Sequence, residues 1–296
     1  MSGLIYFNGI LLSEKEVGLP LKDRGYLYGE GLFETLKATG GCIPFLPEHL
    51  ERLFDSLETL RFKLNVSAAK LEFAVYQTLY HNHLKDAYIR LNLSRENKEL
   101  GDPEPGEKFN LIVMVQPIKK PNKKIMEQGS QAILFKDFKI CPSPLTRVKS
   151  TNYLPYLTVK RFAQDQGVEE ALLSNPNGNL VEGASTNLFL WNGKQWLTPP
   201  IGDGALPGVT RRVLLELMKR HKIPHSEQSL TPQDLSGAEE ALLTNAIVEI
   251  LPLTGWEGHP INGGGIGSQT QRLQELLREE IQYRLEIFES ERGSKS

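Results

Sequence analysis

The hydrophobic positions in the first third of the chain predict a small α+β unit. Two short apolar runs flank Asn8-Gly9, and this dipeptide is the strongest short-range signal for a β-hairpin. Apolar residues then recur at helical spacing, and the runs that follow are typical of strands. The expected elements are a hairpin at 4–12, a helix at 48–60 and strands at 87–93 and 109–115. We therefore expect a first, smaller α+β domain at residues 1–115.

A polar segment follows this unit. Residues 116–124 combine two prolines with four lysines and lack apolar periodicity, so we expect an exposed linker there. Beyond the linker, strand-like and helix-like runs alternate, and the chain closes with an amphipathic helix from about 268 to 292. Residues 125–296 are expected to form a larger second domain. The predicted fold class is accordingly a two-domain α+β or α/β protein.

Composition and charge exclude several classes of function. The 296 residues are 40% hydrophobic and 24% charged, which is close to the average for globular proteins. The net charge of −2 is evenly spread, so we expect no nucleic-acid partner. Cys42 and Cys141 fit neither a disulfide framework nor a zinc site, which favours a reducing, cytoplasmic location without a metal. No run approaches the roughly 20 apolar residues of a membrane span, so no membrane partner is expected either.

Lys149 is the first of four features that could carry chemistry. It stands between a strand-like segment and a helix-like one, within the run from Thr146 to Leu154. A lysine inside a cleft can have a lowered pKa because of desolvation and neighbouring positive charge, and its neutral amine then attacks an aldehyde. Taken alone, this position also fits an ordinary solvated lysine.

Glu182 is the second feature, because it precedes small and hydroxyl residues that lead into an apolar strand. A carboxylate that faces a pyridine nitrogen keeps this nitrogen protonated, and the ring then stabilises a carbanion as an electron sink. An exposed turn residue is the alternative interpretation of Glu182.

The third and fourth features suit the binding of phosphate. Residues 202–210 contain three glycines and lead into a helix, whose free amide groups and dipole attract anions. Thr210 could add a hydroxyl donor, although a plain helix cap explains it as well. Arg52 lies on a helix with an apolar stripe, where its guanidinium fits either bidentate phosphate binding or a solvated face.

These segments together resemble the signature of the class IV aminotransferase family. Glu182–Phe189, with the sequence EGASTNLF, is followed at the family's distance by Leu206–Arg211, with the sequence LPGVTR, and Lys149 stands where the family's Schiff-base lysine stands. The resemblance covers nearly the whole chain, although Trp196 replaces an aliphatic residue. It implies a two-domain fold type IV enzyme, similar to D-amino acid aminotransferase, with pyridoxal 5'-phosphate (PLP) as cofactor. It also implies a homodimer with the site at the domain and subunit interface.

The resemblance assigns roles to particular residues. It implies that Lys149 forms the Schiff base and shuttles the proton, and that Glu182 pairs with the pyridine nitrogen. Tyr153 would approach the phenolic oxygen of the cofactor, although packing at the start of a helix explains this tyrosine equally well. The phosphate-binding residues that the resemblance implies are Arg52, Val209, Thr210, Asn245 and Ala246.

The family includes branched-chain transaminases, D-amino acid transaminases and 4-amino-4-deoxychorismate lyases, and resemblance in fold does not choose among them. Three local features favour the lyase. Thr35 matches a threonine that lyases carry near the substrate, where a hydroxyl could help proton transfer, although β propensity also explains it. Ser150–Tyr153 is one residue shorter than its counterpart in branched-chain transaminases. Asn245-Ala246 resembles the turn of the lyases.

Arg90 keeps a branched-chain transaminase as the alternative, because its segment resembles the strand on which those enzymes carry an arginine near the substrate. Under either interpretation Arg90 is a candidate to bind a substrate carboxylate, and Tyr28 and Phe33 are further candidate substrate contacts. A D-specific transaminase ranks third, because the loop after Arg95 lacks the Arg-x-His pair of those enzymes. A non-enzymatic relative ranks last, because Lys149 and the other cofactor-binding residues are retained.

Overall fold

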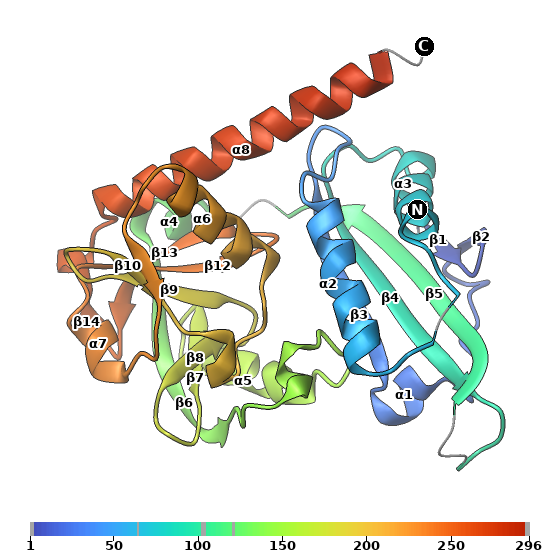
Figure 1. The fold of residues 1–296 in the computed structure, drawn as a ribbon, viewed down its shortest axis with the longest axis horizontal. Helices are drawn as coiled ribbons and strands as arrows, with labels where there is room; N and C mark the ends of the chain where they lie inside the picture. The colour runs from blue at the N-terminus through green and yellow to red at the C-terminus, as the bar shows by residue number, and fades with distance from the viewer. Residues whose placement is uncertain (1–2, 64, 102–104, 120–121, 294–296) are drawn as a thin grey trace. The chain divides into compact units, whose positions relative to one another are not determined.

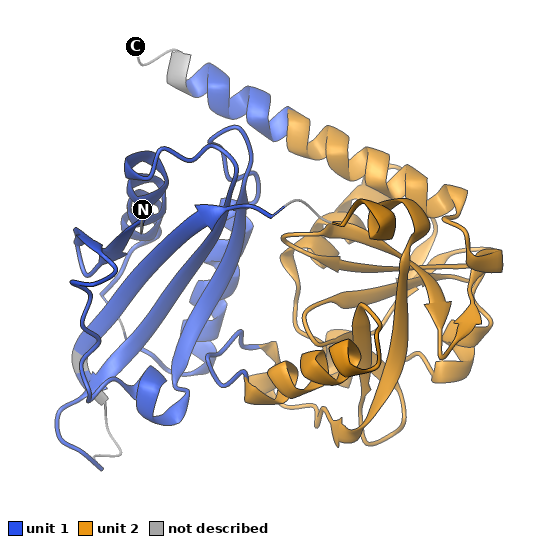
Figure 2. Cartoon of the chain, turned by 180° about the vertical axis from the view of Figure 1, so that it is seen from behind, with its two compact units in different colours: residues 1–119, 148–153, 283–296 blue, residues 120–147, 154–282 orange. Residues whose placement is uncertain are grey.

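The computed structural model describes residues 3–63, 65–101, 105–119 and 122–293 (Figure 1). The chain divides into two compact units (Figure 2). Unit 1 comprises residues 1–119, 148–153 and 283–296, and unit 2 comprises residues 120–147 and 154–282. Each unit has its own sheet and its own apolar core. Among the described residues, no helix combines the length and the apolar character that crossing a bilayer requires.

Unit 1 is built on a five-stranded antiparallel sheet with the strand order β2-β1-β5-β4-β3. The strands are β1 (Leu4–Phe7), β2 (Ile10–Ser13), β3 (Gly31–Ala38), β4 (Ala87–Asn97) and β5 (Pro105–Pro117). The helices are α1 (Arg24–Tyr28), α2 (Leu46–Thr59) and α3 (Ala68–His81). Asn8 and Gly9 both have positive φ, and this conformation forms the expected hairpin between β1 and β2.

Side-chain alternation separates an apolar face of this sheet from a more polar one. Leu32 of β3 and Ile89 of β4 are fully buried in a core that includes Leu53 of α2 and Leu71 of α3. The intervening residues point to the opposite face, because strand side chains alternate with a period of two. The helices therefore pack on one face and leave Thr35 of β3 on the other.

The segment that carries Lys149 belongs to unit 1, although the sequence analysis placed it in the second domain. Phe33 N donates to Lys149 O at 3.0 Å, and Thr151 N donates to Gly31 O at 2.8 Å. Residues 148–153 thus pair with the outer edge of β3, at the end of the strand order. This pairing joins parts of the chain that are more than a hundred residues apart, which no local pattern indicates.

The expected linker at 116–124 is shorter in the structure. Strand β5 continues to Pro117, so the sheet extends into the expected linker. Helix α4 (Lys123–Gln128) begins inside it, because the Asn122 side chain caps the first turn of this helix. Residues 120–121 lie outside the described part of the chain.

Unit 2 contains a nine-stranded sheet in which β9-β12-β13-β6-β7-β8 close into a ring, because β8 pairs again with β9. The pair that closes the ring is Glu182 with Asn187. The strands are β6 (Ser130–Lys139), β7 (Glu170–Ser174), β8 (Leu180–Gly183), β9 (Asn187–Trp191), β10 (Trp196–Thr198), β11 (His225–Glu227), β12 (Glu240–Asn245), β13 (Glu249–Trp256) and β14 (His259–Pro260).

The helices of unit 2 cover this sheet, and strand β7 contributes to two of the apolar clusters of this unit. The helices are α4, α5 (Leu154–Asp165), α6 (Val209–Arg220), α7 (Pro232–Ser236) and the first part of α8 (Ser268–Gly293). Leu172 of β7 packs in one cluster with Leu243 of β12, and Leu173 packs in the other with Val159 of α5. Both faces of β7 are therefore buried, which explains its continuous apolar run.

Helix α8 spans the range predicted for the last amphipathic helix and contributes to both units. In unit 1, Arg284 pairs with Glu48 at 2.7 Å. In unit 2, the buried Glu240 accepts hydrogen bonds from Thr270 N and Thr270 Oγ1, both at 2.7 Å, and so caps the start of the helix.

Candidate active site

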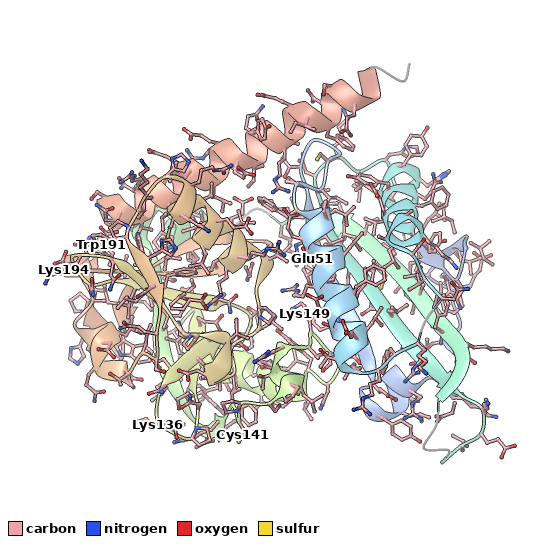
Figure 3. All side chains as sticks on the ribbon, in the orientation of Figure 1. Glu51, Lys136, Cys141, Lys149, Trp191 and Lys194 are labelled. Carbon is pink, nitrogen blue, oxygen red and sulfur yellow. The ribbon has the colours of Figure 1, made fainter. Side chains whose placement is uncertain are left out.

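Lys149, which is labelled in Figure 3, lies against two aromatic side chains of unit 1. Its Nζ atom lies 4.4 Å from the centroid of the Phe33 ring and 5.8 Å from that of the Tyr153 ring. These two rings meet edge to face with their centroids 5.4 Å apart. The side chain of Lys149 is partly buried, and its backbone is fixed to β3. An amine held in a partly apolar environment suits the role of nucleophile.

Arg90 lies on the more polar face of the same sheet. It is the direct partner of Thr35 across β4 and β3, so the two side chains share a face. The Cζ atom of Arg90 lies 3.8 Å from the centroid of the Phe33 ring, and its Nε atom donates to Asn92 Oδ1 at 3.1 Å. Phe33 therefore contacts both Arg90 and Lys149, and these three predicted site residues form one cluster.

Tyr28 ends the short helix α1 in unit 1. Asp23 caps the start of this helix, and its buried carboxylate accepts from Tyr26 N at 2.9 Å and from Asn110 Nδ2 at 2.7 Å. The Tyr28 ring lies 5.1 Å from Arg24 Cζ, and 52% of the residue is exposed. The structure thus places Tyr28 beside Arg24, and its contact with substrate stays a prediction.

Arg52 is buried, so the alternative of a solvated face residue is wrong. Its Nε atom donates to Glu34 Oε1 at 2.9 Å, and His49 Nδ1 lies 2.7 Å from Glu34 Oε2. Burial alone would raise the pKa of Glu34, but the charge of Arg52 and the hydrogen bonds from His49 and Arg52 lower it to about 2. Glu34 therefore fixes the guanidinium of Arg52 as part of a buried ion pair.

Glu182 is also buried, with 5% of the residue exposed, which contradicts the alternative of an exposed turn residue. Leu206 N donates to Glu182 Oε2 at 2.9 Å, and Asn187 Nδ2 donates to the same oxygen at 3.3 Å. The Tyr156 hydroxyl donates to Oε1 at 3.2 Å. These three donors fix the orientation of the carboxylate at the point where the sheet of unit 2 closes into a ring.

The N-terminus of α6 follows the glycine-containing loop of unit 2. Gly208 is its N-cap residue, and the first intrahelical hydrogen bond runs from Arg212 N to Gly208 O at 2.9 Å. The amide groups of Val209, Thr210 and Arg211 precede this bond, so the helix supplies no acceptor for them. Val209 and Thr210 are both buried, and the positive end of the helix dipole lies at this point.

The Asn245-Ala246 turn follows β12 in the same unit. The side chain of Asn245 organises this turn, because its Oδ1 atom accepts from Ile247 N at 2.8 Å and from Val248 N at 2.9 Å. Its Nδ2 atom donates to Ser185 O at 3.1 Å. The turn is thereby tied to the loop that follows Glu182 in the sequence.

The polar groups of unit 2 fit a cofactor that carries a phosphate and a basic ring nitrogen. The start of α6 offers backbone donors to a phosphate, and the buried carboxylate of Glu182 offers an acceptor to a protonated nitrogen. The buried Thr244 Oγ1 atom has no hydrogen-bond partner within the described ranges. Thr244 pairs with Asn187 across β12 and β9, so this hydroxyl is available next to Asn187 for a bound group.

Several residues that support the predicted ones were not predicted from the sequence. Asn187 stands within the segment quoted for the resemblance, yet its contact with Glu182 depends on the closing of the sheet. Glu34 follows the candidate Phe33 directly and could have been suspected as a partner of Arg52. Tyr156 carried no signal of its own beyond its place one turn after Tyr153.

Comparisons with known proteins extend over both units. The sequence model of the amino-transferase class IV family matches residues 31–256. A relative from Methanocaldococcus jannaschii, whose name assigns it provisionally as a branched-chain amino acid aminotransferase, is 34% identical over 277 residues, which are 93% of this chain and 95% of the relative. The aminodeoxychorismate lyase of Bacillus subtilis is 31% identical over 282 residues, 94% of each chain.

A similar fold occurs in a solved structure. The crystal structure of the branched-chain amino acid aminotransferase of Escherichia coli superposes with a TM-score of 0.87 at 28% identity, and the match covers 93% of each chain. Proteins named as D-alanine aminotransferases are also among the relatives. The relatives thus share a family and a fold, while their names report three different activities.

Proposed function

Because this chain belongs to the class IV aminotransferase family, we propose that it is a 4-amino-4-deoxychorismate lyase, which releases 4-aminobenzoate and pyruvate. Enzymes of the family use PLP and act on small amino and keto acids. The chain is therefore a PLP-dependent enzyme, and the alternative of a non-enzymatic relative is excluded. The fold is that of fold type IV, with mixed α and β structure and two sheets.

The proposal of a lyase activity rests on Thr35. It shares the more polar face of unit 1 with Arg90, its direct partner across the sheet. The Arg90 guanidinium can hold a carboxylate of the substrate, and the Thr35 hydroxyl can pass a proton as pyruvate leaves. A residue without a hydroxyl at this position would supply no such group.

The other site residues hold the cofactor in this proposal. Lys149 would bind PLP covalently and would move protons at the reacting carbon, while Glu182 would keep the ring nitrogen protonated. The amide groups of Val209 and Thr210, the Asn245-Ala246 turn and the Arg52 guanidinium bind the phosphate. PLP itself supplies an electron sink for the bonds that break at the substrate. Tyr153 packs beside Lys149 and is assigned to the phenolic oxygen of PLP.

A branched-chain transaminase is the second candidate. The relative from M. jannaschii supports it through 34% identity over nearly the whole chain, and Arg90 would bind the carboxylate of an amino acid in the same way. The two activities differ in what happens to the amino group. A transaminase keeps this group on the cofactor, whereas in the lyase reaction the group leaves as the amino group of 4-aminobenzoate, and pyruvate is the second product.

The visible absorption spectrum of the purified holoenzyme separates these candidates. We expect the band of lysine-bound PLP to persist when L-glutamate and then L-leucine are added, and pyruvate to be released from aminodeoxychorismate. Bleaching of the band by either amino acid, without pyruvate release, would favour the transaminase. Lys149→Ala should abolish both the band and turnover, while the exposed Lys194→Ala serves as the matched control (Figure 3).

A homodimer completes the proposal. We place its interface at exposed large apolar side chains of unit 1, among them Leu21 (80% exposed), Tyr26 (67%) and Leu100 (70%), because burial of apolar surface drives association. Light scattering should give about twice the mass of one chain. The double variant Leu21→Glu/Tyr26→Glu should then give the mass of one chain, whereas a monomeric wild type would contradict the proposal.

A further inference from the structure

Two strands of unit 2 begin and end with almost the same residues. Residues 169–175 read EEALLSN and contain β7, and residues 239–245 read EEALLTN and contain β12. The first residue of each strand is a buried glutamate, with 4% of Glu170 and 8% of Glu240 exposed. Each terminal asparagine accepts two backbone N–H groups of the turn that follows through its Oδ1 atom. Each strand therefore begins with a buried glutamate, and each heptapeptide ends with an asparagine that binds the following turn.

The two glutamates have the same kinds of hydrogen-bond partners. Glu170 accepts from the amides of Ala171 and Ala184, both at 3.1 Å, and from Thr186 Oγ1 at 2.9 Å. Glu240 accepts from the amide of Gln269 at 3.0 Å and from the amide and hydroxyl of Thr270, both at 2.7 Å. Glu240 thereby caps a helix, whereas Glu170 holds a turn between β8 and β9.

The turn at residues 183–186 joins β8 to β9, and the pairing of these two strands closes the ring. Gly183 N donates to Thr186 O at 2.8 Å, which sets its tight geometry. A Cβ atom at Gly183 would lie only 2.7 Å from Glu170 Cδ and would also collide with Thr186 Oγ1. The carboxylate of Glu170 is thus packed directly against the turn, and glycine is required there by this close approach.

Both residues that flank this turn belong to the candidate site. Glu182 precedes it and Asn187 follows it, and Asn187 Nδ2 donates to Glu182 Oε2 at 3.3 Å. Inside the turn, Ser185 O accepts from Asn245 Nδ2 at 3.1 Å. The position of the turn therefore determines where the Glu182 carboxylate lies and how the β12–β13 turn is anchored.

Burying a carboxylate costs free energy, so packing alone does not explain Glu170. Burial raises the pKa of Glu170, against the opposing effects of the Thr186 hydroxyl, the amides of Ala171 and Ala184 and the charge of Lys160. An apolar side chain of similar volume would avoid this cost, but it would leave the Ala184 amide and the Thr186 hydroxyl without an acceptor. The hydrogen bonds to the turn are what the carboxylate supplies.

We propose that Glu170 is a positioning residue, which fixes the turn at residues 183–186 so that the Glu182 carboxylate is held in place for the ring nitrogen of PLP. This inference rests on the proposed role of Glu182. Glu170 does not contact the cofactor in this account and acts only through the turn. Loss of its carboxylate should loosen the turn and weaken the binding of PLP.

The repeated strand sequence supplies a matched control. Glu170→Ala and Glu240→Ala each remove a buried carboxylate that accepts from two amides and one threonine hydroxyl, at the same position of two nearly identical heptapeptides. Both variants should lower the unfolding midpoint. We expect Glu170→Ala to raise the dissociation constant of PLP roughly tenfold, because the buried donors of the turn lose their acceptor. Glu240→Ala should leave this constant within about twofold of the wild type.

The experiment is a fluorescence titration of the full-length protein with PLP, after the cofactor has been removed, combined with hydrogen exchange of the backbone. Glu170→Ala should speed exchange in residues 183–187, whereas Glu240→Ala should speed it at the start of α8. Glu170→Gln should restore most of the affinity, because its carbonyl oxygen still accepts from the Ala184 amide. If Glu170→Ala fails to fold, Thr186→Val removes one donor of the same network and should weaken binding in the same direction.

Glu182→Ala distinguishes failure of the inference from failure of the proposed function. If Glu182→Ala binds PLP with the affinity and spectrum of the wild type, the proposed role of Glu182 is overturned and the inference falls with it. If Glu182→Ala alters both the affinity for PLP and the spectrum, but Glu170→Ala weakens PLP binding no more than Glu240→Ala does, the role of Glu170 as a positioning residue is overturned. Weakened binding in Glu170→Ala with rescue by Glu170→Gln supports the inference.

Discussion

The amine of Lys149 lies over the ring of Phe33, with 4.4 Å between Nζ and the ring centroid, and the main chains of the same two residues are joined by the hydrogen bond from Phe33 N to Lys149 O. Lys149 is therefore fixed to β3 through both its backbone and its side chain. The Cζ atom of Arg90 lies 3.8 Å from the same ring centroid. One aromatic ring thus contacts the proposed nucleophile and the proposed carboxylate-binding residue.

Phe33→Leu should lower kcat/KM by roughly tenfold, because a cation–π contact contributes about 0.5–2 kcal/mol and about 1.4 kcal/mol corresponds to tenfold in rate. Leucine keeps an apolar side chain at this position, so the unfolding midpoint should change little. Phe109→Leu is the control, since it removes a ring that lies 5.3 Å from Lys70 Nζ in the same unit. An equal loss of activity in both variants would contradict the special role of Phe33.

Thr35→Ala tests the proposal that the protein is a lyase. If the hydroxyl passes a proton as pyruvate leaves, its removal should lower kcat by about a hundredfold while KM for aminodeoxychorismate changes little, because general acid–base groups contribute roughly 10²–10⁴ in rate. Thr35→Ser restores the hydroxyl and should recover most of the rate. The measurement is the steady-state release of pyruvate. A rate in Thr35→Ala equal to that of the wild type would remove the observation on which the lyase proposal depends.

Gly208→Ala should weaken the binding of PLP. A Cβ atom at Gly208 would collide with Asn187 Oδ1, and Asn187 contacts both Glu182 and Leu206 O. The substitution should therefore displace both Asn187 and the start of α6, where the phosphate is proposed to bind. Gly202→Ala is the control from the same loop, because nothing lies within 4 Å of its added Cβ. Titration with PLP measures both, and similar dissociation constants would contradict the predicted phosphate site.

Local signals in the sequence predicted the elements of the fold. Asn8-Gly9 marked the first hairpin, and the spacing of leucines marked α2 and α8. Both depend only on the residues within the element itself, so a single sequence carries them. The resemblance added the family and the cofactor, because EGASTNLF and LPGVTR are specific to it.

The relationships that assemble the site were not predictable in the same way. Residues 148–153 pair with β3, and Arg52 pairs with Glu34 inside the core, and both contacts depend on how distant segments meet. The equivalence of Glu170 and Glu240 was visible in the sequence as a repeated heptapeptide. The structure was needed to interpret this equivalence, because only the hydrogen-bond partners show that Glu170 binds a turn and Glu240 binds the start of a helix.

The buried trio Glu34, His49 and Arg52 predicts sensitivity to acid with a definite sign. Burial lowers the pKa of His49, and the charges of Arg52 and Lys149 lower it further, against the opposing hydrogen bond and charge of Glu34. Burial alone would raise the pKa of Glu34, yet Arg52 and His49 lower it to about 2. As the pH falls, the unfolded chain therefore binds a proton at each group before the folded chain does.

The free energy of unfolding should consequently decrease as the pH drops below 6.5, the ordinary pKa of the histidine, and again below 4.5, that of the glutamate. Each group contributes at most about 1.4 kcal/mol per pH unit. Glu170 acts in the opposite direction in the acid range, because its raised pKa lets the folded chain take up that proton first. Just below pH 6.5, the free energy of unfolding measured with urea should fall less steeply with decreasing pH in His49→Asn than in the wild type. Substitution of the exposed His259 by Asn is the control. The same slope in all three proteins would mean that His49 is not held neutral in the folded state.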